Sequence, residues 1–215
     1  MKKCLLSIAI SLSLSACMIP IGSKPAVAKP ASASNVPAVS GNAKVTSQSA
    51  GFDRTLSEQG VTFHVSSPNV GSINTLRIQP SGLKADNALI ERQIEGTVTG
   101  AEVADLNVDG SPELYVYVTS AGSGSHGSLV AYAANKGKSL SEIYLPPIEE
   151  DKAAAKGYMG HDEFAVVEST LVRRFPVYKD GDTNSQPTGG TRQIQYKLKA
   201  GEAGWILRPD KIVNY

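Results

Sequence analysis

The pattern that most constrains the fold is a succession of short β-type runs that begins at Phe52. The runs alternate between apolar and polar residues or concentrate β-branched and aromatic residues, and Gly, Pro, Asn or Asp separates most of them. They are residues 61–65, 76–79, 88–94, 113–119, 129–134, 140–145, 163–168, 170–178, 192–198, 205–207 and 212–213. The alternation is cleanest where it places Leu114, Val116 and Val118 on one face. Only residues 151–156 read as helical, so we predict an all-β fold, an antiparallel sandwich or barrel.

The first 51 residues read as an export signal and a tether. Lys2 and Lys3 precede an apolar run at 4–16, which is too short to span a bilayer but suits a signal peptide. The run ends in LSAC, which resembles the lipobox of bacterial lipoproteins, where the thiol of the cysteine, here Cys17, receives diacylglycerol. The alternative is an ordinary secretory signal cut after Ala28. Residues 18–50 contain no aromatic residue and are rich in Ala, Ser, Pro, Val and Lys, which is typical of a flexible linker.

We therefore expect a lipoprotein signal peptide at 1–16, a lipidated cysteine and disordered linker at 17–51, and a folded domain at 52–215. Met18 follows the cysteine, which by resemblance to enterobacterial sorting favours a periplasmic protein anchored to the outer membrane. The domain holds 16 basic and 20 acidic residues, a formal charge of −4 that argues against a nucleic-acid partner. It contains no cysteine, which excludes disulfides, cysteine nucleophiles and cysteine-based zinc sites there.

The segment DLNVDGSPE resembles part of a calcium-binding loop. Asp105, Asn107, Asp109 and Glu113 offer oxygen ligands at positions one, three, five and nine, with Gly at position six. An EF-hand also needs a Glu at position twelve, where Val stands, and helices on both sides, where we expect strands. Two interpretations remain: a short calcium loop of the β-propeller kind, and a tight Asp-Gly turn whose side chains bind the backbone. We prefer the turn and expect no cofactor.

A Ser- and Gly-rich segment at residues 120–128 (SAGSGSHGS) joins two expected strands. It contains a formal G-x-G-x-x-G pattern, but a dinucleotide site also needs a long helix, and the sequence that follows is too short for one. We interpret it as a long hairpin connection, since an ordinary hairpin loop has two to five residues. Such a loop is either a thin finger that can enter a narrow cleft or a floppy connection without function.

Two further groups of residues are weaker candidates for chemistry. Ser123 lies outside a G-x-S-x-G motif, and His126 so close to it is better explained as a loop side chain than as a general base, so we expect no hydrolase. His161, Asp162 and Glu163 offer metal ligands, but consecutive residues in an extended chain point to opposite faces. A turn or a salt-bridged edge is the preferred interpretation there.

Six segments of the domain carry a resemblance to a known family. They are GAEVADLNVDGSPELYVYV at 100–118, SAGSGSHGSLVAYAA at 120–134, GYMGHDEFAVV at 157–167, LVRRFPV at 171–177, PTGGTRQ at 187–193 and GEAGW at 201–205. In order and across residues 52–215, they resemble the bacterial periplasmic inhibitors of I-type (invertebrate) lysozymes. The family is a β-sandwich, often a homodimer, that inserts a Ser/Gly-rich loop into the substrate cleft of lysozyme. The resemblance therefore implies an antiparallel β-sandwich lysozyme-inhibitor domain that is not an enzyme, with a homodimer among its assemblies.

Carried over to this chain, the lysozyme-binding loop is Ser123, Gly124, Ser125, His126 and Gly127. The family's loop has a Ser followed three residues later by Tyr; Ser123 matches, and His126 stands where Tyr is expected. An imidazole donates a hydrogen bond more strongly when it is protonated, so we expect inhibition to strengthen below about pH 6.5. The alternative function is a calcium- or glycan-binding envelope lipoprotein without lysozyme inhibition.

Charge adds to this expectation. The acidic domain would attract a cationic lysozyme and accelerate their encounter, and salt should slow it. Arg173, Arg174 and Arg192 either contact the enzyme or pair with acids on the surface of the domain.

Overall fold

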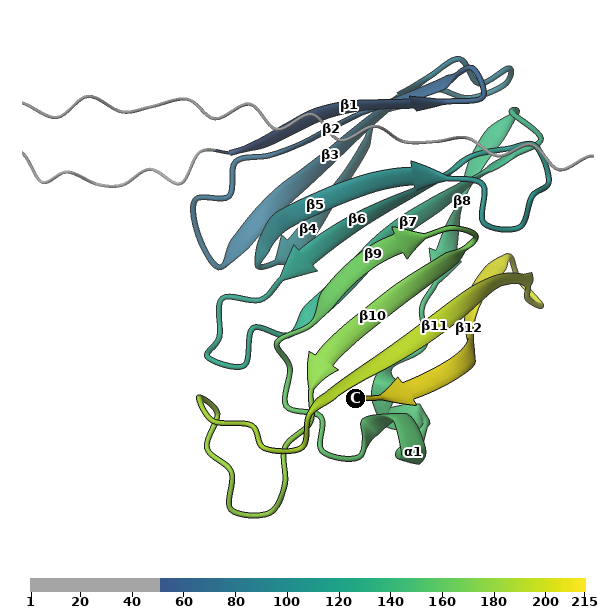
Figure 1. The fold of residues 1–215 in the computed structure, drawn as a ribbon. Helices are drawn as coiled ribbons and strands as arrows, with labels where there is room; N and C mark the ends of the chain where they lie inside the picture. The colour runs from purple at the N-terminus through teal and green to yellow at the C-terminus, as the bar shows by residue number, and fades with distance from the viewer. Residues whose placement is uncertain (1–50) are drawn as a thin grey trace, which may run out of the picture. The chain divides into compact units, whose positions relative to one another are not determined.

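The computed structural model describes residues 51–215. The predicted signal peptide, Cys17 and residues 18–50 of the linker lie outside the described residues. Within residues 51–215, no helix has the length and apolarity needed to cross a membrane. The fold there is nearly all β, as predicted, with two sheets packed together (Figure 1).

The smaller sheet has four antiparallel strands in the order β1 (Phe52–Glu58), β2 (Val61–Ser67), β3 (Ile73–Ser81) and β4 (Ile90–Glu95). The larger sheet has eight strands in the order β5-β6-β7-β8-β12-β11-β10-β9. Their bounds are β5 (Thr97–Ala104), β6 (Glu113–Thr119), β7 (Gly127–Asn135), β8 (Ser139–Tyr144), β9 (Glu163–Val167), β10 (Thr170–Pro176), β11 (Thr191–Ala200) and β12 (Trp205–Asn214). One pairing in the larger sheet, between β8 and β12, is parallel and short.

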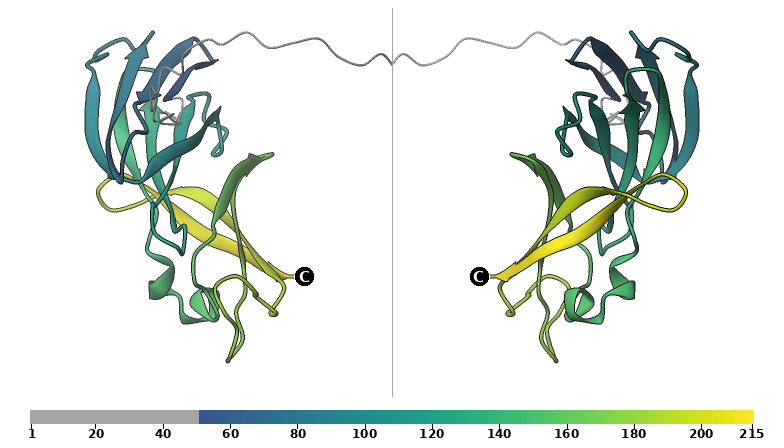
Figure 2. Two further views of the ribbon diagram at one scale, coloured as in Figure 1. Left: turned by 90° about the vertical axis from the view of Figure 1, so that its left-hand side faces the viewer. Right: turned by 90° about the vertical axis from the view of Figure 1, so that its right-hand side faces the viewer.

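Strand β6 lies at the centre of the packing because both of its faces are buried. Leu114, Val116 and Val118 point into a core shared with apolar side chains of β2 and β3, which confirms the face predicted from their alternation. Tyr115 and Tyr117 point the other way, into a second core completed by β10, β11 and β12. Figure 2 shows the four-stranded sheet lying over the β5–β8 part of the larger sheet, from which β9–β12 turn away.

The two edges of the larger sheet approach each other around this second core. The Val166 N–H of β9 donates to Glu102 Oε2 of β5 across 2.7 Å, and the Tyr117 hydroxyl donates to the same carboxylate. The rings of Tyr117 and Phe164 stack with centroids 5.8 Å apart. Contacts between β5, β6 and β9 therefore link the two edges, so the larger sheet is strongly curled.

The helical prediction for residues 151–156 is also confirmed. A 3₁₀ turn, η1 (Ile148–Glu150), leads into the single helical turn α1 (Lys152–Ala155). Asp151 caps α1 by accepting the N–H groups of Ala153 and Ala154 at 2.9 and 3.0 Å. These elements occupy the long connection between β8 and β9, and they lead the chain toward the end of the domain that carries the β6–β7 loop.

Candidate functional site

The Ser/Gly-rich connection between β6 and β7 is a compact seven-residue loop, residues 120–126. Thr119 pairs with Gly127, so β7 begins two residues earlier than predicted and Gly127 belongs to the strand. Two hydrogen bonds between Ser120 and His126 hold the two ends of the loop together. The Ser120 N–H donates to His126 O, and Ser120 Oγ accepts the His126 N–H, both at 2.9 Å. A turn at the tip is closed by the Ser125 N–H, which donates to Gly122 O at 2.9 Å.

The tip of this loop presents hydrogen-bond donors to solvent. Ser123 and His126 are exposed, whereas Ser125 is half-buried and has a positive φ of 42°. Within residues 51–215, no hydrogen bond is made by the backbone N–H of Gly122, Ser123 or Gly124. A hydroxyl and a short run of amides are therefore available to bind an acceptor such as a carboxylate.

Two neighbouring segments hold the carbonyl groups of the tip. The His161 N–H donates to Gly124 O across 2.7 Å, and Asn184 Nδ2 donates to Ser123 O across 2.7 Å. Gly160, at φ 93°, permits this approach, because a Cβ there would lie only 2.0 Å from Gly124 O. The loop is thus braced from outside, which argues against a floppy connection and is compatible with the predicted finger.

A buried ion pair supports the base of the loop. Arg173 Nε donates to Asp162 Oδ1 at 2.7 Å, and these side chains are 6% and 0% exposed. The other oxygen, Asp162 Oδ2, accepts the Gly127 N–H at 2.7 Å and the Tyr158 hydroxyl at 2.6 Å. Burial and the hydrogen bond to Asp162 raise the pKa of Tyr158, so it stays a neutral donor. The rings of Tyr158 and His126 also form a T-shaped contact, with centroids 5.6 Å apart.

These contacts decide several sequence-based alternatives. His161, Asp162 and Glu163 do not converge on one point, because the His161 ring binds Asn184 while Asp162 binds Arg173. These contacts agree with the predicted turn or salt-bridged edge. Arg173 is buried, and Arg192 donates to carbonyl oxygens at the end of α1. Arg174 is bonded to a glutamine of β11. Within residues 51–215, none of the three arginines pairs with a surface acid, so that alternative was wrong, and all three bond to other groups of the domain.

The acidic loop between β5 and β6 adopts the predicted Asx turn. Asp105 accepts the N–H groups of Asp109 and Gly110 at 3.0 and 2.9 Å, and Asn107 Oδ1 also accepts the Asp109 N–H at 3.1 Å. Carboxylate oxygens of Asp105, Asp109 and Glu113 nevertheless lie within 4.8 Å of one another. Burial, and then the charges of the two aspartates, raise the pKa of Glu113 to about 8. Three carboxylates therefore lie close enough to share a cation, although Asp105 and Asp109 already accept backbone N–H groups of the turn and Glu113 accepts the Leu106 N–H.

Sequence reasoning did not identify Asn184, Tyr158 or Gly160 as part of this site. Asn184 lies 61 residues beyond the serine whose carbonyl it binds, inside a polar stretch that reads only as a loop. Gly160 carried a usable signal, since a glycine before a polar turn suggests a close backbone approach. Comparison with known proteins found no matching family model, no matching curated protein and no matching solved structure.

Proposed function

We propose that this chain inhibits a lysozyme, most specifically the invertebrate type, by inserting residues 120–126 into the substrate cleft. The observation that carries the proposal is a braced loop, lined by small residues, that turns the Ser123 hydroxyl and unpaired backbone amides outward. This loop is the segment that resembles the inhibitory loop of the periplasmic lysozyme inhibitors. Its support from Asn184 and His161 favours insertion, because a preorganised loop loses less entropy on binding.

The chemistry of the target suits these donors. A lysozyme hydrolyses its glycan with two carboxyl groups that flank the scissile glycosidic bond, and one of them acts as a general acid. A hydroxyl from Ser123 and an amide from Gly124 can donate to such a carboxyl group while occupying the sugar subsite. A carboxylate that accepts hydrogen bonds is stabilised in its ionised form, so the acid would lose the proton that it must deliver. Inhibition then combines steric blockade with disturbance of the catalytic acid.

His126 is placed to contribute a second contact. This residue is exposed, and its ring makes a T-shaped contact with the ring of Tyr158. The tyrosine expected here from the resemblance would reach further than an imidazole. The histidine offers a ring N–H as donor where the tyrosine would offer a hydroxyl.

A lytic assay tests the proposal directly. The purified full chain is mixed with invertebrate-, chicken- or goose-type lysozyme, and the clearing of peptidoglycan suspensions is followed. Inhibition of the invertebrate type is expected, and the double variant Ser123→Ala, His126→Ala should lose it while keeping its melting temperature. Ser128→Ala, an exposed serine on β7, is the matched control and should inhibit normally. If no class of lysozyme is inhibited, the proposal is wrong.

The second candidate function is a calcium- or glycan-binding envelope lipoprotein. The observation that favours its calcium form is the group of three carboxylates, Asp105, Asp109 and Glu113, described above. A calcium-dependent rise in melting temperature that is lost in Asp105→Ala, together with absence of lysozyme inhibition, would favour this function over the first.

A further inference from the structure

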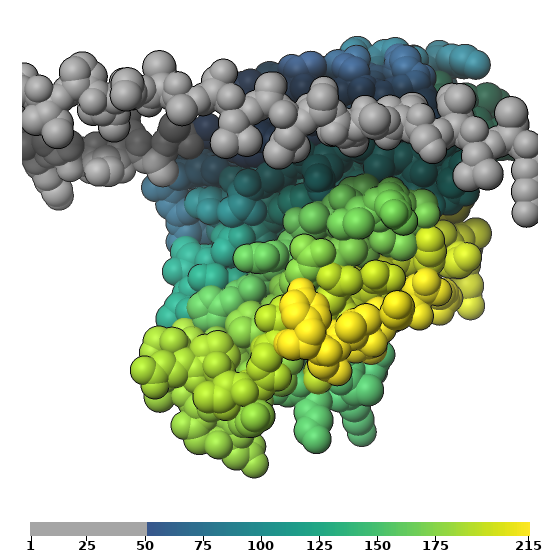
Figure 3. Space-filling model, in the orientation of Figure 1, coloured from purple at the N-terminus to yellow at the C-terminus, as the bar shows by residue number. Residues whose placement is uncertain are grey.

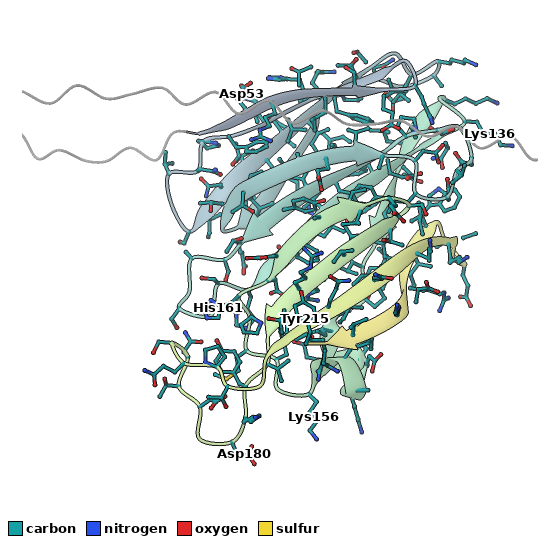
Figure 4. All side chains as sticks on the ribbon, in the orientation of Figure 1. Asp53, Lys136, Lys156, His161, Asp180 and Tyr215 are labelled. Atoms are coloured by element: carbon teal, nitrogen blue, oxygen red, sulfur yellow. The ribbon has the colours of Figure 1, made fainter. Side chains whose placement is uncertain are left out.

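The loop between β10 and β11, residues 177–190, lies at the same end of the domain as the β6–β7 loop. Figure 3 shows it standing out from the surface, and Figure 4 places Asp180 of this loop on the same side as His161. Despite its length, the segment is strongly cross-linked within itself. Asp182 accepts the N–H groups of Lys179 and Thr188 at 2.7 and 2.8 Å, and its carboxylate also accepts the Thr188 hydroxyl.

Asn184 is the point at which this segment meets the β6–β7 loop. Its backbone carbonyl accepts the Tyr178 hydroxyl at 2.9 Å, which fixes its main chain. Its side-chain amide is fixed at both ends: Nδ2 donates to Ser123 O at 2.7 Å, and Oδ1 lies 3.1 Å from His161 Nε2. Because an amide oxygen can only accept, the His161 ring must donate through Nε2. The orientation of the Asn184 amide is therefore determined by its partners.

The direction of the Ser123 carbonyl determines where the next amide points. In a trans peptide unit the C=O and the following N–H point in opposite directions. A Ser123 carbonyl held toward Asn184 therefore turns the Gly124 N–H away from Asn184, where it meets no acceptor among residues 51–215. Without Asn184 this peptide unit would lack the bond that keeps it from rotating, since glycine follows and imposes little restriction of its own.

We propose that Asn184 is a positioning residue of the inhibitory loop: by binding Ser123 O, it directs the Gly124 amide and the Ser123 hydroxyl outward together. This inference rests on the proposed function. It extends the functional unit from seven contiguous residues to a second segment that begins more than fifty residues later in the chain. The segment acts through the β6–β7 loop and need not touch the lysozyme itself.

The test compares two amide-to-acid substitutions in the same segment. Asn184→Asp keeps an oxygen for His161 but removes the donor and sets a carboxylate against Ser123 O, so we expect the inhibition constant to rise about tenfold or more. Gln186→Glu makes the same change in charge at an exposed side chain that bonds to no other side chain in residues 51–215, and it should inhibit as the wild type does. Melting temperatures of both variants should stay close to that of the wild type.

A spectroscopic readout separates positioning from general damage. In ¹⁵N spectra of the full chain, Asn184→Asp should shift the Gly124 amide resonance and increase the mobility of residues 122–124, while signals from the two cores stay in place. If Asn184→Asp unfolds the domain, Asn184→Ala replaces it in both measurements. Unchanged inhibition by a folded Asn184 variant, or loss of inhibition only in variants that have lost the fold, would overturn the positioning role. If the wild type itself inhibits no lysozyme, the proposed function fails and the positioning role fails with it.

Discussion

Replacing Glu113 by glutamine should change how the stability of the domain depends on pH. Glu113 is 1% exposed, and its Oε2 accepts the Leu106 N–H at 2.8 Å and the Tyr115 hydroxyl at 3.3 Å. Glutamine has nearly the same shape and keeps one oxygen to accept these bonds, but it cannot ionise. The substitution therefore removes one titration from the buried end of β6 and leaves the packing almost unchanged.

The sign and size of the effect follow from the pKa of Glu113. It rises from 4.5 to about 8 on folding, chiefly because of burial. Between these values the folded state holds a proton that the unfolded state has released, so stability falls as the pH rises through this range. The cost of keeping glutamate instead of glutamine is about 1 kcal/mol at pH 5 and about 3 kcal/mol at pH 7, taking 1.36 kcal/mol for each pKa unit. Glu113→Gln should accordingly be the more stable protein at neutral pH.

Urea unfolding between about pH 5 and pH 8, with EDTA present to remove divalent cations, measures this difference. The free energy of unfolding of Glu113→Gln minus that of the wild type should grow by about 2 kcal/mol from pH 5 to pH 7. The exposed residue Glu149, changed to glutamine, is the control and should give no comparable trend. A difference for Glu113→Gln that does not vary with pH would refute the reasoning, because the buried carboxyl would then not be holding a proton in the folded state.

Three further predictions concern the supports of the two loops. Gly160→Ala, which places a methyl group against Gly124 O, should lower the free energy of unfolding by about 2 kcal/mol and weaken inhibition in the lytic assay. Arg173→Met should cost about 3 kcal/mol in urea unfolding because it leaves Asp162 buried without its ion-pair partner; a loss below about 1 kcal/mol would contradict that account. Asp105→Ala should lower the free energy of unfolding by about 1–2 kcal/mol, because it removes the hydrogen bonds that Asp105 accepts in the turn. The melting temperature of the wild type should not rise when calcium is added.

Strand β6 shows why the sequence could predict most of the strands. Leu114, Val116 and Val118 face one core, and their regular spacing was sufficient to find β6. Two strands were not predicted, β1 and β5. Strand β1 is largely exposed, and β5 contains Gly100 at a register shift, so neither strand shows a clean period of two.

Sequence patterns could not predict the curl of the larger sheet. It depends on a bond between Glu102 and the Val166 N–H, across 64 residues, and on the short parallel pairing of β8 with β12. Short β-type runs separated by turn residues are typical of antiparallel neighbours, so a local pattern gives no sign of a parallel pair joined through η1, α1 and three intervening strands.

The candidate site also has one part that the sequence could predict and another that depends on the fold. The composition of the β6–β7 loop left its role open, and the resemblance to the lysozyme inhibitors assigned it a function. The donors of Ser123 and Gly124 are properties of that local segment. Their direction is not local. It depends on Asn184 and His161, which the fold brings to the loop from two other connections.

A Ser/Gly-rich loop motif is therefore an insufficient criterion for the inhibitory activity proposed here. A related chain could keep the segment SGSH and lose the residue that binds its first carbonyl, and its loop would then sample conformations in which the Gly124 N–H points inward. Conversely, a chain with a different residue at the His126 position could keep the activity if both supports remain, because the serine hydroxyl and the amide would still be aimed together. The discriminating feature to seek in related sequences is the pair of an amide side chain in the β10–β11 connection and a glycine at the position of Gly160, which together determine the direction of the loop.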